Sequence, residues 1–289
     1  MRKQGDFGDP VRIGSSGGAE LAVRLMRSDR VQAPLALILP AMGVPARFYA
    51  SFARGLHQAG LHVATADLRG QGDSSPRPRR GVNFGYRELA EDDLPAVMRT
   101  IRNLVPAAPL VLVGHSLGGQ LALLGGPAGA DAIVLVASGS GWWRTFGAGR
   151  GVRNLLVGQA FAALAAGLGY WPGERLGFGG TQATTVMRDW ARQGRTGRYR
   201  LTGSGTDHEA ALAAVRLPVL AVSVENDAFA PPASVDHLLS KIPSATISRW
   251  CYTRALADGQ PIDHFRWVRH SGKACQHIAN WIDDLFSAE

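Results

Sequence analysis

Three residue types that together perform nucleophilic catalysis follow one another in this chain of 289 residues: a serine, then an aspartate, then a histidine. The serine, Ser116, is the centre of Gly114-His-Ser-Leu-Gly118, a G-x-S-x-G pattern between an apolar run and a helix-compatible one. Glycines at these positions permit a tight strand-turn-helix elbow that lifts the serine hydroxyl clear of a sheet. Ser116 is therefore the predicted nucleophile.

A second match to the same pattern occurs near the start of the chain. Gly14-Ser-Ser-Gly-Gly18 places Ser16 at its centre, but it lies between two short strand-like runs, 11–13 and 20–26. Glycines between such runs supply the positive φ angles of a hairpin turn. We predict that Ser16 is a turn residue, because its neighbours do not form an elbow.

A serine hydroxyl is a poor nucleophile at neutral pH unless a histidine accepts its proton and a carboxylate orients that histidine. Asp227 follows an apolar strand-like run and is the predicted acid, with Glu225 as the alternative. His264 precedes the last helical segment and is the predicted base, with His270 as the alternative. Asp263 adjoins His264, and since adjacent residues face apart it is not expected to be the acid.

The reaction also requires two backbone N–H groups that stabilise the oxyanion of the tetrahedral intermediate. One is predicted to be the amide of Leu117, directly after the nucleophile and at the start of a helix whose dipole favours negative charge. The other is expected in the turn after the first buried strand, 39–44, where Met42 is the predicted donor.

Strand-like apolar runs alternate with helical patterns over most of the chain, which indicates an α/β fold with a mostly parallel, doubly wound sheet. The predicted strands are 34–39, 61–66, 110–113, 132–137, 218–224 and 245–250. The predicted helices with an apolar face are 47–59, 86–104 and 272–286. We expect the core to comprise residues 1–138 and 213–289.

The alternation stops after residue 139, and we predict a helical cap, 139–212, inserted over the carboxyl ends of the strands. Within it, residues 142–204 carry nine arginines against Glu174 and Asp189, a net charge of 9 − 2 = +7 out of +8 for the chain. The arginines are Arg144, Arg150, Arg153, Arg175, Arg188, Arg192, Arg195, Arg198 and Arg200. A solvated face explains such a segment, and attraction of an anionic substrate or a membrane surface is the alternative.

Composition narrows the class of protein further. Two cysteines, Cys251 and Cys275, give neither a disulfide framework nor metal spacing, and the histidines form no zinc pattern. We therefore expect no metal, no cofactor and no nucleic-acid partner. The first residues lack the apolar segment of a signal peptide, and we expect no apolar run of membrane-spanning length. A cytoplasmic location is the default expectation, and the sequence leaves the oligomeric state open.

The chain resembles the α/β-hydrolase superfamily, and within it the serine hydrolases of the monoglyceride-lipase and serine-aminopeptidase type. Asp67-Leu-Arg-Gly-Gln-Gly-Asp-Ser-Ser75 is similar to the loop D-x-R-G-x-G-x-S of that family, Gly114 to Gly118 to its elbow, and Asp227-Ala-Phe-Ala-Pro231 to its acid turn. Pro40-Ala41 replaces the usual His-Gly of the oxyanion loop. The likeness covers 34–137 and 217–289 and implies an α/β-hydrolase fold.

These observations predict a serine hydrolase that cleaves carboxylic esters of a small-molecule acyl substrate through an acyl-enzyme on Ser116. Thioesterase, peptidase or acyltransferase chemistry would use the same residues. A serine at the elbow argues against dehalogenase or epoxide-hydrolase chemistry, which uses an aspartate. The rival from another class is a non-catalytic protein that binds a ligand through the basic cap, and peripheral membrane contact by that cap is a further possibility.

Overall fold

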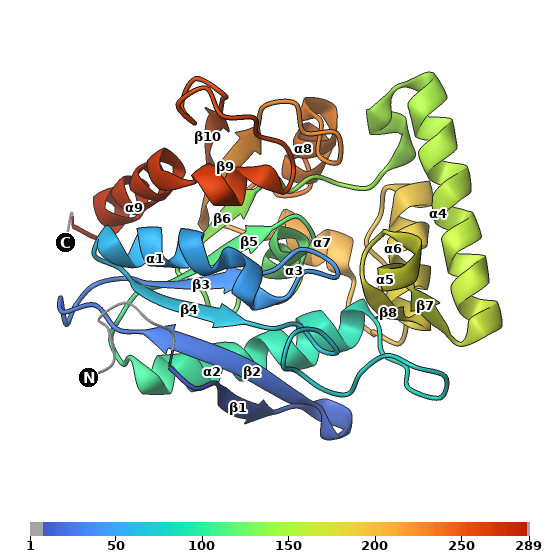
Figure 1. The fold of residues 1–289 in the computed structure, drawn as a ribbon, viewed down its shortest axis with the longest axis horizontal. Coiled ribbons are helices and arrows are strands. Elements are labelled where there is room, and N and C mark those ends of the chain that lie inside the picture. Colours follow the sequence, from blue (N-terminus) through green and yellow to red (C-terminus); the bar gives the residue numbers. More distant parts are fainter. Residues whose placement is uncertain (1–7, 288–289) are drawn as a thin grey trace.

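The structure is a computed structural model that describes residues 8–287, and its centre is an eight-stranded sheet (Figure 1). The strand order is β1-β2-β4-β3-β5-β6-β9-β10. Their bounds are β1 Val11–Gly14, β2 Glu20–Met26, β3 Leu35–Leu39, β4 His62–Ala66, β5 Leu110–His115, β6 Ala132–Val136, β9 Pro218–Val224 and β10 Thr246–Tyr252. The pairs β1–β2 and β2–β4 are antiparallel and the remaining pairs are parallel. The predicted, mostly parallel sheet is confirmed.

Helices cover both faces of the sheet, as the continuous burial of β3 to β6 requires. Alternate side chains of β3 separate the two cores, since Leu37 packs in one cluster and Ile38 in the other. On the Leu37 side lie α2 (Leu94–Leu104), α3 (Leu117–Gly125), α7 (His208–Ala213) and α8 (Pro232–Leu239). On the Ile38 side lie α1 (Ala50–Gln58) and α9 (Gly272–Phe286), which contact each other.

The predicted helices are found with local changes at their first turns. The run expected at 47–59 begins as a 3-10 turn, Ala46–Tyr49, before α1. The run expected at 86–104 contains a widened π-helical turn, Glu88–Asp93, before α2. Apolar spacing predicts the buried face of a helix and carries no information about where its hydrogen-bond pattern tightens or widens.

The segment between β6 and β9 contributes no strand to the main sheet. It forms α4 (Ala148–Leu168), β7 (Tyr170–Pro172), α5 (Gly173–Leu176), β8 (Thr181–Ala183) and α6 (Thr184–Thr196). The strands β7 and β8 pair with each other in an antiparallel hairpin. We call residues 139–212 the cap, and Figure 1 shows it beside the carboxyl ends of the parallel strands, with α4 outermost. Its own small core contains Ala165, Trp171 and Met187.

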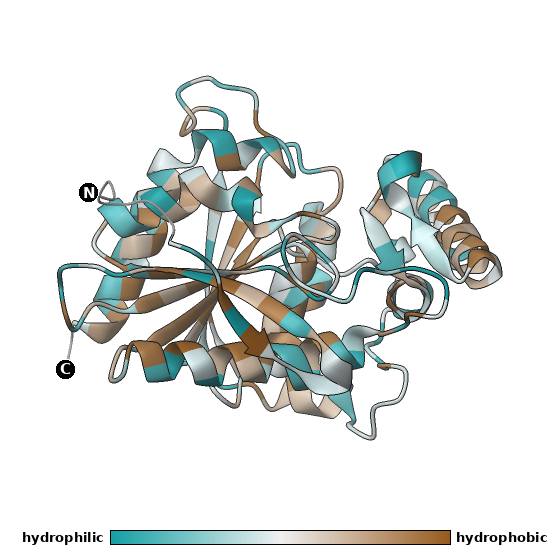
Figure 2. Cartoon of the chain, turned by 60° about the horizontal axis from the view of Figure 1, so that its bottom comes forward, coloured by the Kyte–Doolittle hydropathy of each residue, from teal (hydrophilic) through white to brown (hydrophobic). Residues whose placement is uncertain are grey.

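The structure corrects the expectation about membrane-spanning length. The 21 residues of α4 include an 18-residue window with a mean hydropathy of 1.3, enough by length and composition to cross a membrane, and 17% of that window is buried. Small residues and two arginines interrupt the larger apolar residues of α4, and for this reason the sequence pattern did not indicate a helix of membrane-spanning length. A single helix of this kind does not establish a membrane span. Figure 2 shows its hydrophobic residues at the outer edge of the molecule.

Candidate active site

The elbow between β5 and α3 holds Ser116 in a strained conformation. Its φ of 53° and ψ of −116° lie outside the regions that a side chain ordinarily permits, and strain of this kind gathers at functional sites. The flanking glycines are required by space. A Cβ on Gly118 would lie 2.1 Å from the Leu39 carbonyl oxygen, and one on Gly119 would lie 2.1 Å from Ser138 Oγ. The turn therefore presents the hydroxyl of Ser116 above the edge of the sheet.

The structure brings the three predicted side chains together in one hydrogen-bonded row. His264 Nε2 lies 3.0 Å from Ser116 Oγ, and His264 Nδ1 lies 2.8 Å from Asp227 Oδ2. The Asp227 side chain is 1% exposed. Its other oxygen, Oδ1, accepts hydrogen bonds from the amides of Phe229 at 2.7 Å and Ala230 at 2.9 Å. One carboxylate thus holds both its own turn and the imidazole.

The alternative residues lie elsewhere and have other partners. Ser16 donates to Asp92 at 2.5 Å and accepts from Arg69 at 3.1 Å, in the turn between β1 and β2. Glu225 accepts from the amide of Arg254. His270 makes no side-chain hydrogen bond within the described residues, and its carbonyl accepts from Tyr252. None of these three alternative residues is hydrogen-bonded to Ser116, His264 or Asp227.

Two backbone amides beside Ser116 are available to a ligand. Within residues 8–287 neither Met42 nor Leu117 donates its N–H to a protein acceptor, and both residues line the same cavity as Ser116. The neighbouring Ala41 amide is already used, because it donates to Tyr49 Oη at 2.9 Å. Tyr49 therefore fixes the loop so that the next amide, that of Met42, stays free. Sequence reasoning missed Tyr49.

The phenol of Tyr49 also connects this loop to the elbow. Its Oη lies 2.7 Å from His115 Nδ1, and both side chains are buried. Burial holds the pKa of His115 well below its usual range, and the nearby charge of His264 lowers it further. Burial likewise raises the pKa of Tyr49 far above that of a free phenol. We conclude that both groups are neutral and act as fixed supports of the loop and the elbow.

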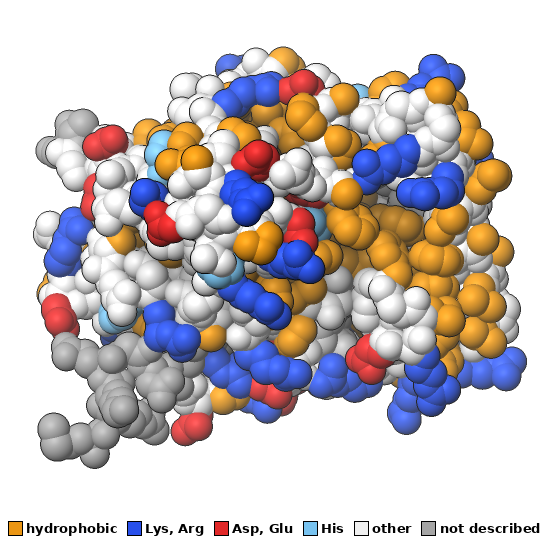
Figure 3. Space-filling model, turned by 45° about the horizontal axis from the view of Figure 1, so that its top comes forward, with side chains coloured by type: hydrophobic (Ala, Val, Ile, Leu, Met, Phe, Trp, Pro, Cys, Tyr) orange, Lys and Arg blue, Asp and Glu red, His pale blue; other side chains and the backbone are white. Residues whose placement is uncertain are grey.

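A cavity of about 580 Å³ opens in front of Ser116, between the core and the cap. Apolar side chains from the cap form much of its wall: Leu155, Val157, Phe161, Phe178 and Trp190. Figure 3 shows hydrophobic side chains gathered around a hollow, with Lys and Arg side chains beside it. The sequence predicted a cap over the site but did not identify these residues, because they come from separate turns of α4, the α5–β8 loop and α6.

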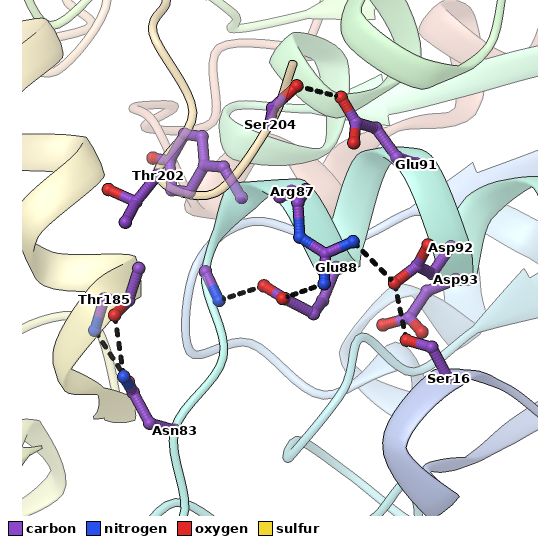
Figure 4. A network of polar contacts seen from close by, with 12 residues as sticks. Ser16, Asn83, Arg87, Glu88, Glu91, Asp92, Asp93, Thr185, Thr202 and Ser204 are labelled. Carbon is purple, nitrogen blue, oxygen red and sulfur yellow. Dashed lines mark hydrogen bonds and ion pairs between the residues drawn. The ribbon is translucent and has the colours of Figure 1, made fainter. Parts of the chain in front are cut away.

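Polar contacts join the cap to the core (Figure 4). Asn83 donates to Thr185 Oγ1 at 2.8 Å and accepts from the Thr185 amide at 2.9 Å. Ser204 donates to Glu91 at 2.5 Å. Asp189 is buried and accepts from the Tyr86 amide at 3.2 Å and from Thr202 Oγ1 at 2.5 Å, although burial still raises its pKa. These bonds fix the position of α6 relative to the elbow.

Metal chemistry has no candidate site in the part of the chain that the structure describes. Within residues 8–287 no group of three or more His, Cys, Asp or Glu side chains is placed to hold an ion. The two cysteines are unpaired, Cys251 at the surface and Cys275 buried, where burial raises its pKa to about 11.

Comparisons with solved structures agree with this fold. The chain is similar to a membrane phospholipase A described as a bacterial virulence factor, with 18% identity, 98% of this chain and 88% of that chain covered, and a TM-score of 0.63. It is similar to DcsB in complex with its substrate analogue, with 16% identity, 96% and 99% covered, and a TM-score of 0.68. It is also similar to the esterase EaEST from Exiguobacterium antarcticum, with 14% identity, 95% and 99% covered, and a TM-score of 0.64.

At these identities the solved structures show the fold alone. A search of curated protein sequences found no significant match. A family model does match, and it spans residues 32–256, which is most of the chain and includes the cap. The predicted resemblance to serine hydrolases of the α/β-hydrolase superfamily is confirmed by this match. The chain belongs to the family described as serine aminopeptidase, S33, and is an α/β-hydrolase enzyme.

Proposed function

We propose that this enzyme hydrolyses carboxylic esters through an acyl-enzyme formed on Ser116. The observation that carries the proposal is the row of hydrogen bonds from Ser116 through His264 to Asp227, at a strained elbow beside two free amides. The apolar cavity in front of Ser116 suits the acyl or alcohol part of an ester, because burying hydrocarbon there is favourable.

The proposed reaction begins when His264 Nε2 accepts the proton of Ser116 Oγ, which attacks the ester carbonyl carbon. The oxyanion that forms accepts hydrogen bonds from the amides of Met42 and Leu117. Asp227, bonded to Nδ1–H, stabilises the imidazolium and fixes its tautomer. His264 then gives the proton to the departing alkoxide, so that an alcohol leaves and an acyl ester remains on Ser116.

Water completes the cycle by the same route. His264 takes a proton from the water molecule as the oxygen attacks the acyl carbon, and returns it to Ser116 Oγ as the carboxylic acid departs. Thioesters and amides differ only in the leaving group, and an acyltransferase differs only in the acceptor that replaces water. The cavity in front of Ser116 selects the leaving group and the acceptor.

The test is a matched panel in which a p-nitrophenyl butyrate ester, a butyryl thioester and a butyryl anilide are offered to the wild-type enzyme. We expect turnover of the ester to exceed that of the amide, with the free acid as product. Preferential cleavage of the thioester or amide would replace the ester assignment, and a transferred acyl group would indicate an acyltransferase. Ligand binding without cleavage of any of the three would favour the non-catalytic rival.

Asp227→Asn is expected to lower kcat by about 10⁴-fold, because an amide cannot hold Nδ1–H and stabilise the imidazolium as a carboxylate does. Glu225→Gln is the matched control, two residues earlier in the same turn, and should keep kcat within about twofold. Stopped-flow or plate assays with the p-nitrophenyl ester measure both. A larger loss for the Glu225 variant would move the acid from Asp227 to Glu225.

Peripheral contact with a membrane surface is a second candidate property, favoured by the outer face of α4. Four large apolar side chains of this helix that do not line the cavity are at least two-fifths exposed: Val152, Leu156, Leu164 and Leu168. Exposed apolar side chains gathered on one element mark interaction surfaces, and the net positive charge of the cap suits anionic lipid. We propose that α4 lies against such a surface while the cavity faces substrate.

Sedimentation with vesicles of phosphatidylcholine and phosphatidylglycerol tests this property. Leu156, which is 63% exposed in the free protein, is replaced with Asp. This change should weaken vesicle binding about tenfold, because the bound state loses an apolar side chain that the lipid would bury. Val31→Asp is the control, since Val31 is 85% exposed on the loop between β2 and β3. Vesicle binding that does not change between 0.05 and 0.5 M salt would count against attraction by the arginines. Equal binding by the wild type, the Leu156 variant and the Val31 variant would show that α4 is not part of the interface.

A further inference from the structure

The cavity in front of Ser116 has an uneven charge. Two arginines of α4, Arg150 and Arg153, line it, and among the described residues no aspartate or glutamate does. The two acids within residues 142–204 are elsewhere, since Asp189 is bonded to Thr202 and Tyr86 and Glu174 lies outside this cavity. An apolar cavity with two cations and no anion is therefore electrostatically unbalanced.

The two guanidinium groups differ in how they are held. Arg150 donates to the carbonyl of Ala228, the residue after Asp227, and its guanidinium carbon lies 5.9 Å from the ring centre of Phe146. Arg150 thus bridges the cap to the acid turn. Arg153 has no hydrogen bond or ion pair within residues 8–287. The neighbouring Asn154, which also lines the cavity, has none for its side chain either.

The position of these arginines on α4 adds to the imbalance. The helix begins at Ala148 without a side-chain cap and without an acid in its first turn. Its first turn thus holds a cation, Arg150, at the positive end of the helix dipole, where an anion would be favoured. Departures from a local rule of this kind are expected where a function requires them. An anion beside Arg153 would pair with its guanidinium group and would also be attracted by Arg150.

We infer that Arg153, with Arg150, forms an anion subsite, and that the preferred substrate is an ester bearing a carboxylate or phosphate group remote from the bond that is cleaved. This inference rests on the proposed ester hydrolysis at Ser116. A guanidinium fork pairs with either oxyanion through two parallel N–H donors. The apolar side chains that line the same cavity would hold the hydrocarbon that separates the anion from the reacting carbonyl.

The experiment compares p-nitrophenyl butyrate with the p-nitrophenyl monoester of glutaric acid, which adds a carboxylate to the acyl chain. The ratio of kcat/KM for the anionic ester to that for the neutral ester is measured for wild type, Arg153→Gln, Arg153→Lys and Arg188→Gln. Arg188 is the matched control, an exposed arginine on α6 outside the cavity. Inhibition of neutral-ester cleavage by glutarate and by inorganic phosphate distinguishes the two oxyanions.

Arg153→Gln should lower that ratio by about 10- to 100-fold, the loss of one charge-assisted pair, and leave neutral-ester cleavage within twofold. Arg153→Lys should restore part of the ratio, and Arg188→Gln should not change it. An equal fall in the Arg188 variant would overturn the subsite in favour of the general charge of the cap. A ratio unaffected by Arg153→Gln would overturn it while ester hydrolysis stands. If wild type cleaves neither ester, the proposed function fails and the inference falls with it.

Discussion

Replacing Ser116 with alanine is expected to lower kcat for ester hydrolysis by about 10⁶-fold, because the acyl-enzyme cannot form without its nucleophile. The amides of Met42 and Leu117 would remain, so a residual rate above that of water is expected. Alanine removes only one oxygen from a hydroxyl that faces the cavity, and the folded structure should persist. Steady-state kinetics with the p-nitrophenyl ester, with circular dichroism as the check on folding, provide the measurement.

Ser16→Ala is the matched control, since Ser16 is the centre of the other G-x-S-x-G pattern. Its hydroxyl is bonded to Asp92 and Arg69, so its loss should cost about 1 kcal/mol of unfolding free energy and leave kcat within twofold. Retained activity in the Ser116 variant together with lost activity in the Ser16 variant would reverse the assignment.

His264→Ala is expected to lower kcat by a similar factor of about 10⁶, because serine and histidine act as one unit and the loss of either removes the whole effect. The double variant with Ser116→Ala should be no slower than either single variant. This lack of additivity is the signature that separates a direct role in the reaction from a general loss of structure.

His270→Ala is the control for the base. It lies six residues later, and within residues 8–287 its side chain bonds to no partner, so kcat should stay within about twofold. A loss of activity in the His270 variant equal to that in the His264 variant would show that the loop, and not one imidazole, is being disturbed.

The sequence was sufficient to predict the residues at the elbow because their signals are local. An apolar strand, a glycine pattern and a helix start within ten residues locate Ser116. Asp227 and His264 were predicted from their places after later strands, and parallel strands bring their carboxyl ends to one edge. The structure joins these side chains by distances of 2.8 and 3.0 Å.

The supports of the site could not be predicted from local patterns. Tyr49 reaches across from the turn before α1 to the Ala41 amide and to His115, and a lone tyrosine in a helical segment gives no sign of such contacts. The residues that the cap contributes to the cavity wall could not be predicted for a similar reason. These residues belong to elements that are positioned by contacts between distant parts of the chain. Asn83 and Thr185, for example, bond to each other and are about a hundred residues apart in sequence.

The exposed face of α4 illustrates a different limit. Alanines and glycines alternate with its larger apolar residues, so the run resembles an ordinary core helix in composition. The structure shows instead that few of these residues are buried. Burial depends on what packs against a helix, and residues of similar hydropathy can lie on either side of it.

Covalent labelling with a fluorophosphonate probe, followed by mass spectrometry of the labelled peptide, tests the central claim most directly. The probe reacts with a serine only when a neighbouring base activates its hydroxyl. We expect a single adduct on Ser116 in the wild-type enzyme and none in Ser116→Ala. An adduct on another residue, or labelling that persists in the Ser116 variant, would contradict the account.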